Sequence, residues 1–461
     1  MTRLVSLLGL GFGDCGKGLF TDFLARHWQA HTVMRFNGGA QAGHNVVLPD
    51  GRHHTFSQFC AATFVPGVAT VLAAPVVVHP GALLVENRVL QQSGVADALQ
   101  RLLIDGRCRI STPFHQAAGR LRELLRGADT HGTCGVGVGA TVQHGLQHPQ
   151  QILHYADLSD ANSNKALAKL DACRQTLLAE FPAACPVPGN AAQYDAERQM
   201  LLDPGISGRW LAQIEELRHA VAPASPVQLR TRLQTPGTVL FEGAQGVLLD
   251  EWRGFHPHTT WSTIHPDAVR AVLADLAIHD PVQHFGILRS YMTRHGQGPL
   301  PTHDPALNLL AEPHNHAESW QGEFRRGHVD AVLLRYALQV CGPLDGLLLS
   351  HLDVFDKLPG LNWCDSYQFS PSSVTNRLVP EACQAATSLR HLPLGKFQDL
   401  EHQAALTALL DAAIPEYDAR PLNNANDLIG KIAALANCPV ILASFGPTHL
   451  DVQILAPEAL T

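Results

Sequence analysis

The segment GLGFGDCGKG, residues 9–18, decides the fold of this chain. It follows the apolar run Leu4–Leu8 and precedes an amphipathic stretch that begins at Leu19. This order predicts a strand, a glycine-rich turn and the start of a helix. In such a unit, backbone N–H groups at the turn and the helix N-terminus bind phosphate without side chains.

Two residues of the segment do not fit a common phosphate loop. From Gly11 to Lys17 the spacing fits G-x-x-x-x-G-K, but Gly18 stands where such loops normally carry a Ser or Thr hydroxyl for magnesium. The loop also contains a carboxylate, Asp14. A negative charge there makes sense if the loop performs chemistry, because a carboxylate can bind magnesium or remove a proton from a substrate.

The rest of the chain alternates apolar runs with amphipathic stretches, which predicts an α/β fold with a large, mostly parallel central sheet and flanking helices. The turns that carry motifs follow predicted strands, where such sheets bind ligands. Further strands are predicted at 33–36, 46–48, 71–74, 76–78, 238–241, 285–288, 347–349 and 440–443, and helices at 86–103, 117–126, 163–181, 208–219 and 267–276.

Composition excludes several classes of protein. Of 461 residues, 46% are hydrophobic and 16% charged, which permits a sizeable core. The formal charge of −8 argues against binding to nucleic acid or to an anionic membrane surface. The ten cysteines form no CxxC pair, and the N-terminus has no secretory signal pattern. We therefore expect a cytoplasmic protein with reduced thiols.

Histidine is abundant, with 26 residues. The clusters HPH (His256, His258) and HNH (His314, His316) could bind a metal ion. They lack the HExxH or CxxC spacing that marks common zinc sites, so we interpret them as polar residues at the protein surface.

Seven segments occur in an order that resembles the adenylosuccinate synthetase family, the GTP-dependent ligases of purine synthesis. They are GFGDCGKG, RFNGGAQAGHN, GTCGVGVGA, FEGAQGVLLD, YMTRHGQGPLPT, HLDVFD and ASFGPT. The resemblance runs from residue 4 to about residue 455. It implies the P-loop-like GTPase fold of that family, a single domain over 1–461 with helical insertions near 86–130 and 160–235, and a homodimer.

The resemblance also implies a mechanism. Family members activate O6 of IMP with the γ-phosphate of GTP, and the amine of aspartate then displaces phosphate at C6. By resemblance, Asp14 is the general base for the N1 proton and holds magnesium together with the carbonyl of Gly43. His44 is the general acid, Lys17 neutralises phosphate charge, and Gln245 hydrogen-bonds the purine edge.

Other nucleotide contacts carry over by position. Asp353 matches the aspartate that accepts from N1 and N2 of guanine; adenine has no N–H donor at that edge, so this residue selects GTP. The remaining residues are Gly11, Gly13, Gly16 and Gly18 in the phosphate loop, Gln41, Thr133, Cys134 and Thr260 around IMP, and Ser444 and Gly446 beside guanine.

The chain departs from the family pattern around both nucleotides. Cys15 replaces a glutamate of the phosphate loop, Cys134 a threonine, Val136 an arginine and His351 a lysine. The segment QHGLQHPQQ (143–151) lacks the family's arginine that reaches the IMP phosphate of the partner subunit. We therefore expect the phosphate site of the 6-oxopurine nucleotide to be weakened or rebuilt.

The largest departure lies in the loop that binds the amino acid, ESWQGEFRRGHVDA (318–331). In the family, two arginines there grip the carboxylates of aspartate. Here Glu323 takes the place of the first and Arg325 that of the second. A buried carboxylate without its partner costs about 3–5 kcal/mol, so aspartate is expected to bind poorly. Alternatively, Arg325 and Arg326 serve jointly.

The leading interpretation is a GTP-dependent ligase for IMP and aspartate. The first alternative is a divergent paralogue, in specialised or phage-like metabolism, that uses a different amine or a different 6-oxopurine nucleotide. The second is a nucleotide-binding protein without activity. Retention of both Asp14 and His44 disfavours it, because binding alone needs neither an acid nor a base.

Overall fold

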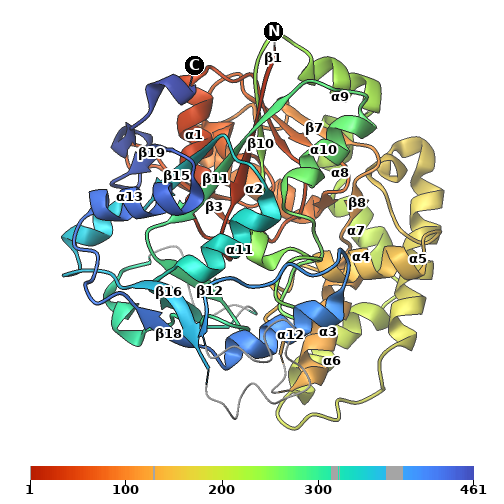
Figure 1. The fold of residues 1–461 in the computed structure, drawn as a ribbon. Helices are drawn as coiled ribbons and strands as arrows, with labels where there is room; N and C mark the ends of the chain where they lie inside the picture. Colours follow the sequence, from red (N-terminus) through yellow and green to blue (C-terminus); the bar gives the residue numbers. More distant parts are fainter. Residues whose placement is uncertain (1, 128–129, 313–319, 321, 370–387, 461) are drawn as a thin grey trace.

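A ten-stranded sheet forms the centre of the molecule (Figure 1). The structure, a computed structural model, describes residues 2–460 except 128–129, 313–319, 321 and 370–387. The strand order is β20-β19-β15-β11-β1-β10-β2-β5-β7-β9. β20 pairs antiparallel with β19, and the other pairings in this sheet are parallel. The predicted α/β class with a large, mostly parallel sheet is thereby confirmed.

The strands of this sheet are β1 (Thr2–Gly9), β2 (Thr32–Arg35), β5 (Ala69–Leu72), β7 (Leu102–Asp105), β9 (Pro223–Ala224), β10 (Gly237–Glu242), β11 (Val282–Arg289), β15 (Gly346–Ser350), β19 (Val440–Ser444) and β20 (Val452–Ile454). Smaller sheets and hairpins contain β3 (His44–Val47), β4 (His53–Phe56), β6 (Val77–Val78), β8 (Arg109–Ile110), β12 (Met292–His295), β13 (Phe324–Gly327), β14 (Val329–Asp330), β16 (Trp363–Gln368), β17 (Ser388–Leu389) and β18 (Ile414–Tyr417).

The helices are α1 (Lys17–His27), α2 (Pro80–Gln92), α3 (Pro113–Arg126), α4 (Val138–Gln147), α5 (Ser163–Ala179), α6 (Ala191–Leu202), α7 (Ile206–Gln213), α8 (Glu215–Ala220), α9 (Pro226–Leu233), α10 (Pro266–Asp275), α11 (Ala331–Cys341), α12 (Leu400–Asp411) and α13 (Ala425–Ala436).

The central strand β1 shows why the sheet is covered on two faces. Successive side chains of a strand point to opposite faces. Val5 and Leu7 pack with apolar residues of α1 in one buried cluster, and Leu4 and Leu8 pack with residues of α10 in another. A continuous apolar run is therefore the pattern expected of a parallel strand between two helical layers.

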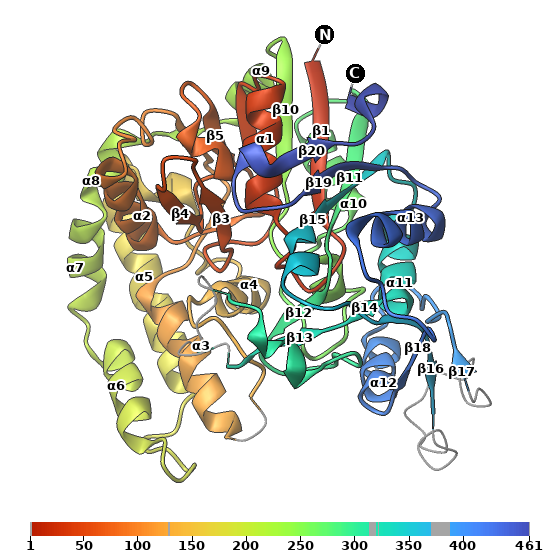
Figure 2. The same cartoon turned by 90° about the vertical axis from the view of Figure 1, so that its left-hand side faces the viewer.

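Two groups of elements lie on opposite flanks of the molecule (Figure 2). Helices α3, α5, α6 and α7 form one flank, and α11, α12 and α13 with β16 and β18 form the other. Strands β12 and β13 lie between them. The carboxyl end of β1 points toward this region, so the loops that follow the central strands meet the lower part of the molecule.

The predicted helix 86–103 is wrong in its bounds. Helix α2 begins at Pro80, where the side chain of His79 accepts from the N–H of Ala82, and it ends at Gln92. Gly94 then adopts a φ of +87°. The apolar residues near the end of the predicted helix belong to strand β7 instead.

One further prediction needs correction. The helix predicted at 208–219 is two helices, α7 and α8, with Ile214 between them. The strands predicted at 46–48 and 76–78 are present as β3 and β6, which pair with β4 and β8 in smaller sheets. Helix α6 was not predicted, because its few buried residues leave little apolar periodicity to detect.

The segments predicted as helical insertions are interwoven with the sheet. Segment 86–130 contributes β7, and segment 160–235 contributes β9, to the main sheet. The single-domain organisation stays a prediction. In the described part of the chain, no helix combines the length and the apolar character needed to cross a membrane.

Candidate active site

A cavity of about 510 Å³ lies where the loops after β1, β2 and β10 meet. These strands are neighbours in the parallel sheet, so their carboxyl ends bring the loops together. Most of the sequence-predicted residues line this cavity: Gly13, Asp14, Lys17, Gln41, Gly43, His44, Thr133, Cys134, Gln245 and Thr260.

The phosphate loop has the predicted strand–turn–helix form. Gly16 adopts a φ of +89° as the N-cap of α1, a conformation that favours glycine. Lys17 is buried, and its ammonium donates to the carbonyl oxygen of Gly13. A phosphate is a stronger partner for this cation than a neutral carbonyl, so the lysine is placed to bind an anion at the loop.

Packing explains why position 18 is glycine. A Cβ on Gly18 would lie 2.3 Å from the carbonyl oxygen of Asn45, because α1 packs directly against β3. A Ser or Thr side chain therefore has no room there. Oxygen ligands for a magnesium ion must come from elsewhere, and Asp14 and Gly43 line the same cavity. Carboxylate and carbonyl oxygens suit this hard cation, so the donor set fits magnesium.

Asp14 is held by a buried arginine that the sequence analysis missed. One N–H of Arg289 donates to Asp14 Oδ2 at 2.8 Å, and Arg289 also contacts Glu312 and the hydroxyl of Tyr291. Burial opposes ionisation of Asp14, but the charge of Arg289, aided by His351, holds the pKa of Asp14 below its ordinary value. The carboxylate is therefore ionised at neutral pH and able to accept a proton.

His44 belongs to a buried ion network. Its Nδ1 lies 2.5 Å from Glu242 Oε1, and its Nε2 lies 3.4 Å from a guanidinium nitrogen of Arg35. Burial, with the positive charge of Arg35, lowers the pKa of His44 to about 3, against the opposing effect of Glu242. The ring is therefore neutral at pH 7. It donates Nδ1–H to Glu242 and leaves the lone pair of Nε2 toward Arg35.

Two glutamine side chains have unused oxygens. The Oε1 atoms of Gln41 and Gln245 are buried and have no hydrogen-bond partner within the described residues. Both residues line the main cavity. Because a buried polar atom without a partner is costly, these oxygens are suited to accept from a bound ligand. An N–H group of a purine edge is such a donor.

The residues expected around guanine lie apart from this cavity. Asp353 follows β15, while Ser444 and Gly446 lie at the carboxyl end of the neighbouring strand β19. Asp353 pairs with Lys357 at 2.5 Å, an ion pair at the protein surface. Ser444 Oγ donates to the carbonyl oxygen of Gly446 at 2.7 Å. The structure thus brings these three residues to one edge of the sheet. Strand β15 lies two strands away from β1 in that sheet.

The amino-acid loop lines a second cavity of about 300 Å³. This cavity contains Glu323 and Arg325 and shares Gly132 and Gln297 with the main cavity. The guanidinium of Arg325 donates to the carbonyl oxygen of Gly296 at 2.6 Å and to that of Gly298 at 2.8 Å. Glu323 is exposed, so the expected cost of a buried like charge does not apply at this position.

Arg326 points away from both cavities. It follows Arg325 on strand β13, where neighbouring side chains alternate between faces, and it donates to Asn308 Oδ1 at 3.0 Å. The alternative in which both arginines grip one ligand is therefore not supported.

The histidine clusters play different parts. His258 lines the main cavity, and its ring lies 6.1 Å from that of His131. His314 and His316 lie outside the described residues. Within the described ranges, the group with metal-ligand geometry is His115, His144 and Cys173, in the helical flank. The sequence analysis did not single out these residues as ligands, because they come from three separate segments.

Comparisons with known proteins agree with the fold and with the assembled motifs. The family model for adenylosuccinate synthetase matches residues 6–452. The adenylosuccinate synthetase of Mycobacterium marinum is 30% identical over 467 residues, covering 96% of each chain. That of Mycobacterium tuberculosis is 31% identical over 461 residues, again covering 96% of each chain.

Two solved structures share the fold. Fully ligated adenylosuccinate synthetase from Plasmodium falciparum superposes with a TM-score of 0.72 at 20% identity, covering 98% of this chain and all of that one. Succinoaminodeoxyadenylate synthetase (PurZ) of cyanophage S-2L, bound to dGMP and dATP, gives a TM-score of 0.55 at 16% identity, with coverage of 100% and 99%. The chain belongs to the adenylosuccinate synthetase family and is a GTP-dependent ligase that joins an amino acid to a 6-oxopurine nucleotide by a C–N bond.

Proposed function

We propose that this ligase joins aspartate to C6 of IMP through a 6-phosphoryl intermediate. One observation supports this most strongly: a single cavity contains the carboxylate of Asp14, the ammonium of Lys17, the imidazole of His44 and the amide oxygen of Gln245, which has no hydrogen-bond partner among the described residues. A carboxylate beside a phosphate loop supplies a base at the point where a phosphoryl group is transferred.

In the proposed reaction, Gln245 orients the purine and Asp14 takes the proton from N1. The oxygen O6 then attacks the γ-phosphorus of GTP, the bond to the β–γ bridging oxygen breaks, and GDP leaves. Lys17 and the loop N–H groups neutralise charge on the transferred group. The amine attacks C6, phosphate leaves, and the amine loses its proton. Asp14 and Gly43 would hold a magnesium ion, which neutralises phosphate charge.

The test is product analysis. The protein is incubated with GTP, magnesium, aspartate and either IMP, GMP or their deoxy forms, and products are identified by mass spectrometry. We expect GDP, phosphate and a succinyl-adenine nucleotide from IMP. Phosphate release without any new C–N product would contradict the proposal.

A different amine is the second candidate. It is favoured by the engagement of Arg325 with two backbone carbonyls and by the carboxylate of Glu323 in the same cavity. Such a pocket holds one carboxylate less tightly than a pair of free arginines would. A pool of amino acids in the same assay separates this candidate from aspartate, because the product mass identifies the amine.

Replacement of Glu323 by arginine should improve the use of aspartate. The change removes a negative charge, which repels the carboxylates of aspartate, and adds a positive charge beside Arg325 that attracts them. Because Glu323 is exposed, the effect should be near 1 kcal/mol, or about a fivefold lower KM for aspartate. The measurement is phosphate release against aspartate concentration, with Glu215→Arg on the exposed surface of α8 as the matched control. An unchanged or higher KM in the Glu323 variant would show that this residue does not face the amine.

Asp353→Asn should lower kcat/KM for GTP about 10-fold to 100-fold and leave the poor use of ATP unchanged. The carboxylate accepts from N1–H and N2–H₂ of guanine, and hydrogen bonds to a charged group contribute about 1.5–3 kcal/mol. Guanine must displace Lys357, but a surface ion pair of this kind is weak. Asp356→Asn, in the same short helix, is the control. If Asp353→Asn and the Asp356→Asn control have the same kcat/KM for GTP, Asp353 does not belong to the guanine site.

We also propose a homodimer and a cytoplasmic location. The homodimer rests on the family resemblance, and the location on the use of GTP and IMP as substrates. Light scattering coupled to size-exclusion chromatography measures the oligomeric state directly.

A further inference from the structure

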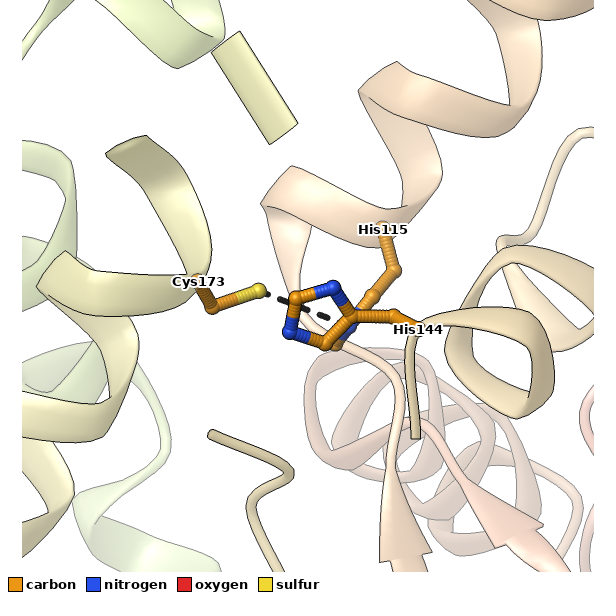
Figure 3. Close-up of side chains that lie close together, drawn as sticks. All are labelled: His115, His144 and Cys173. Carbon is orange, nitrogen blue, oxygen red and sulfur yellow. Dashed lines mark hydrogen bonds between the residues drawn. The ribbon is translucent and has the colours of Figure 1, made fainter. Parts of the chain in front are cut away.

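Three side chains from three helices converge in the helical flank beside the active site (Figure 3). His115 lies in the first turn of α3, His144 near the end of α4, and Cys173 in the middle of α5. Their nitrogen and sulfur ligand atoms all lie within 4.8 Å of one another. We propose that His115, His144 and Cys173 bind a divalent transition-metal ion, with zinc as the preferred ion, and that this ion fixes the wall of the active-site cavity.

The separation of two donor atoms already fits a bound ion. Cys173 Sγ lies 3.5 Å from His115 Nε2. With Zn–N and Zn–S bonds of about 2.0 and 2.3 Å at a tetrahedral angle, the expected separation of nitrogen and sulfur is about 3.5 Å. These two ligands therefore need little movement. The ligand atom of His144 lies within 4.8 Å of the other two.

The second ring nitrogen of His115 contacts Thr112 at the start of α3. Its Nδ1 lies 2.9 Å from Thr112 Oγ1, the residue that caps α3. Nδ1 also accepts from the backbone N–H of Thr112 at 3.3 Å. Binding of a metal at Nε2 therefore requires the other tautomer, in which Nδ1–H donates to the Thr112 hydroxyl and the lone pair of Nε2 faces Cys173. An outer hydrogen bond of this kind fixes the tautomer and the ring orientation of a ligating histidine.

The surroundings of His144 are a second, independent observation that points to a ligand. The residue is 1% exposed, and neither of its ring nitrogens has a hydrogen-bond partner within the described residues. A buried imidazole with two unsatisfied nitrogens is costly, and a metal ion would satisfy one of them. His148, the residue that directly follows α4, has its ring centroid 5.1 Å from that of His144.

Imidazole and thiolate are the donors that zinc prefers, whereas magnesium prefers oxygen. The site is therefore distinct in chemistry from the magnesium ligands proposed at Asp14 and Gly43. Burial raises the pKa of the Cys173 thiol to about 12, so binding of the ion displaces the thiol proton.

The position of the group gives the ion a structural role in the active site. Helix α4 begins directly after the loop that contains Thr133 and Cys134, and both the loop and the first turn of α4 line the main cavity. Residues of α3 line it as well. An ion that links α3, α4 and α5 would hold this wall in place. Its removal should raise the KM of the nucleotide whose phosphate contacts the loop, with less effect on kcat.

Zinc binding is tested on the full chain. The protein is treated with a chelator, dialysed and titrated with zinc, and the metal content is measured by mass spectrometry. We expect one zinc per chain in the wild type and a loss of that zinc in Cys173→Ser. Cys185→Ser, which changes a free cysteine outside the group, should bind like the wild type. Equal binding by both variants would overturn the proposal.

Cobalt gives a second readout that does not depend on any variant folding. Cobalt bound to the wild type should show thiolate-to-cobalt charge transfer in the near ultraviolet, and zinc should abolish it by displacement. A chelated wild-type protein that binds neither zinc nor cobalt would equally overturn the proposal. Thermal unfolding of the wild type should shift to higher temperature on zinc addition, because an ion that binds the native state stabilises it.

Discussion

Asp14→Asn should lower the rate of phosphoryl transfer from GTP by about 10²-fold to 10⁴-fold, the usual contribution of a general base. The asparagine side chain has the same shape but cannot accept the N1 proton. The fold should survive, because Arg289 keeps its contacts with Glu312 and Tyr291 when the charge of Asp14 is removed. The measurement is phosphate release in a single turnover with GTP and IMP.

The design must separate proton transfer from magnesium binding, since Asp14 is proposed to serve both. Saturating magnesium restores metal occupancy if the only defect is affinity, so a rate that stays low under that condition identifies the base. Asp50→Asn is the matched control, because Asp50 is an exposed carboxylate paired with Arg52 at a distant turn. Turnover close to wild type at saturating magnesium would rule out Asp14 as the base.

The local parts of this site could be predicted from the sequence because each is a short loop that follows an apolar strand. The phosphate loop after β1 and the EGAQG turn after β10 are examples. Their meeting also follows from general rules, since parallel strands place such loops at one edge of the sheet. The order of the strands then decides which loops are adjacent, and β1 lies directly beside β10.

Contacts between distant segments could not be predicted in this way. Arg289 and Asp14 are separated by 275 positions, and His44 and Glu242 by 198. Arg289 ends β11 and Glu242 ends β10, so the signal for these two partners was a charged residue at the end of a strand. The spacing along the chain, however, does not show which two strand ends become neighbours.

Other differences arise from local geometry. The segment that forms the end of α2, a turn and β7 has apolar residues at spacings that also fit one long helix, and Gly94 was the stronger sign of an end. For Arg325 and Arg326, the length of the arginine side chain alone allowed both residues to bind one carboxylate. The strand β13 places neighbouring side chains on opposite faces, which does not support joint action.

His44→Asn should lower the rate of phosphoryl transfer by about 10²-fold to 10⁴-fold while GTP and IMP still bind. The physical reason lies in the buried pair with Glu242. In the free protein the ring is neutral, since its pKa is about 3, and its Nδ1–H is donated to Glu242. To act as an acid on the transferred phosphoryl group, Nε2 must first take up a proton. A bound phosphate dianion favours this, because an opposite charge nearby stabilises the imidazolium.

The pH dependence tests this order of events. If each productive complex must take up a proton at His44, kcat/KM for GTP falls as the pH rises from about 6 to 8, because protons become scarcer while the free ring stays neutral. The His44→Asn variant should lose this slope. His31→Asn, at the amino end of β2 and so at the opposite edge of the sheet, should keep it. A flat wild-type profile together with a slow His44→Asn variant would mean that the neutral ring only positions the phosphate, and the acid role would then fall. Full activity of His44→Asn would exclude the residue from the chemistry, and the Glu242 pair would then serve only to anchor the loop that carries Gln41 and Gly43 against β10.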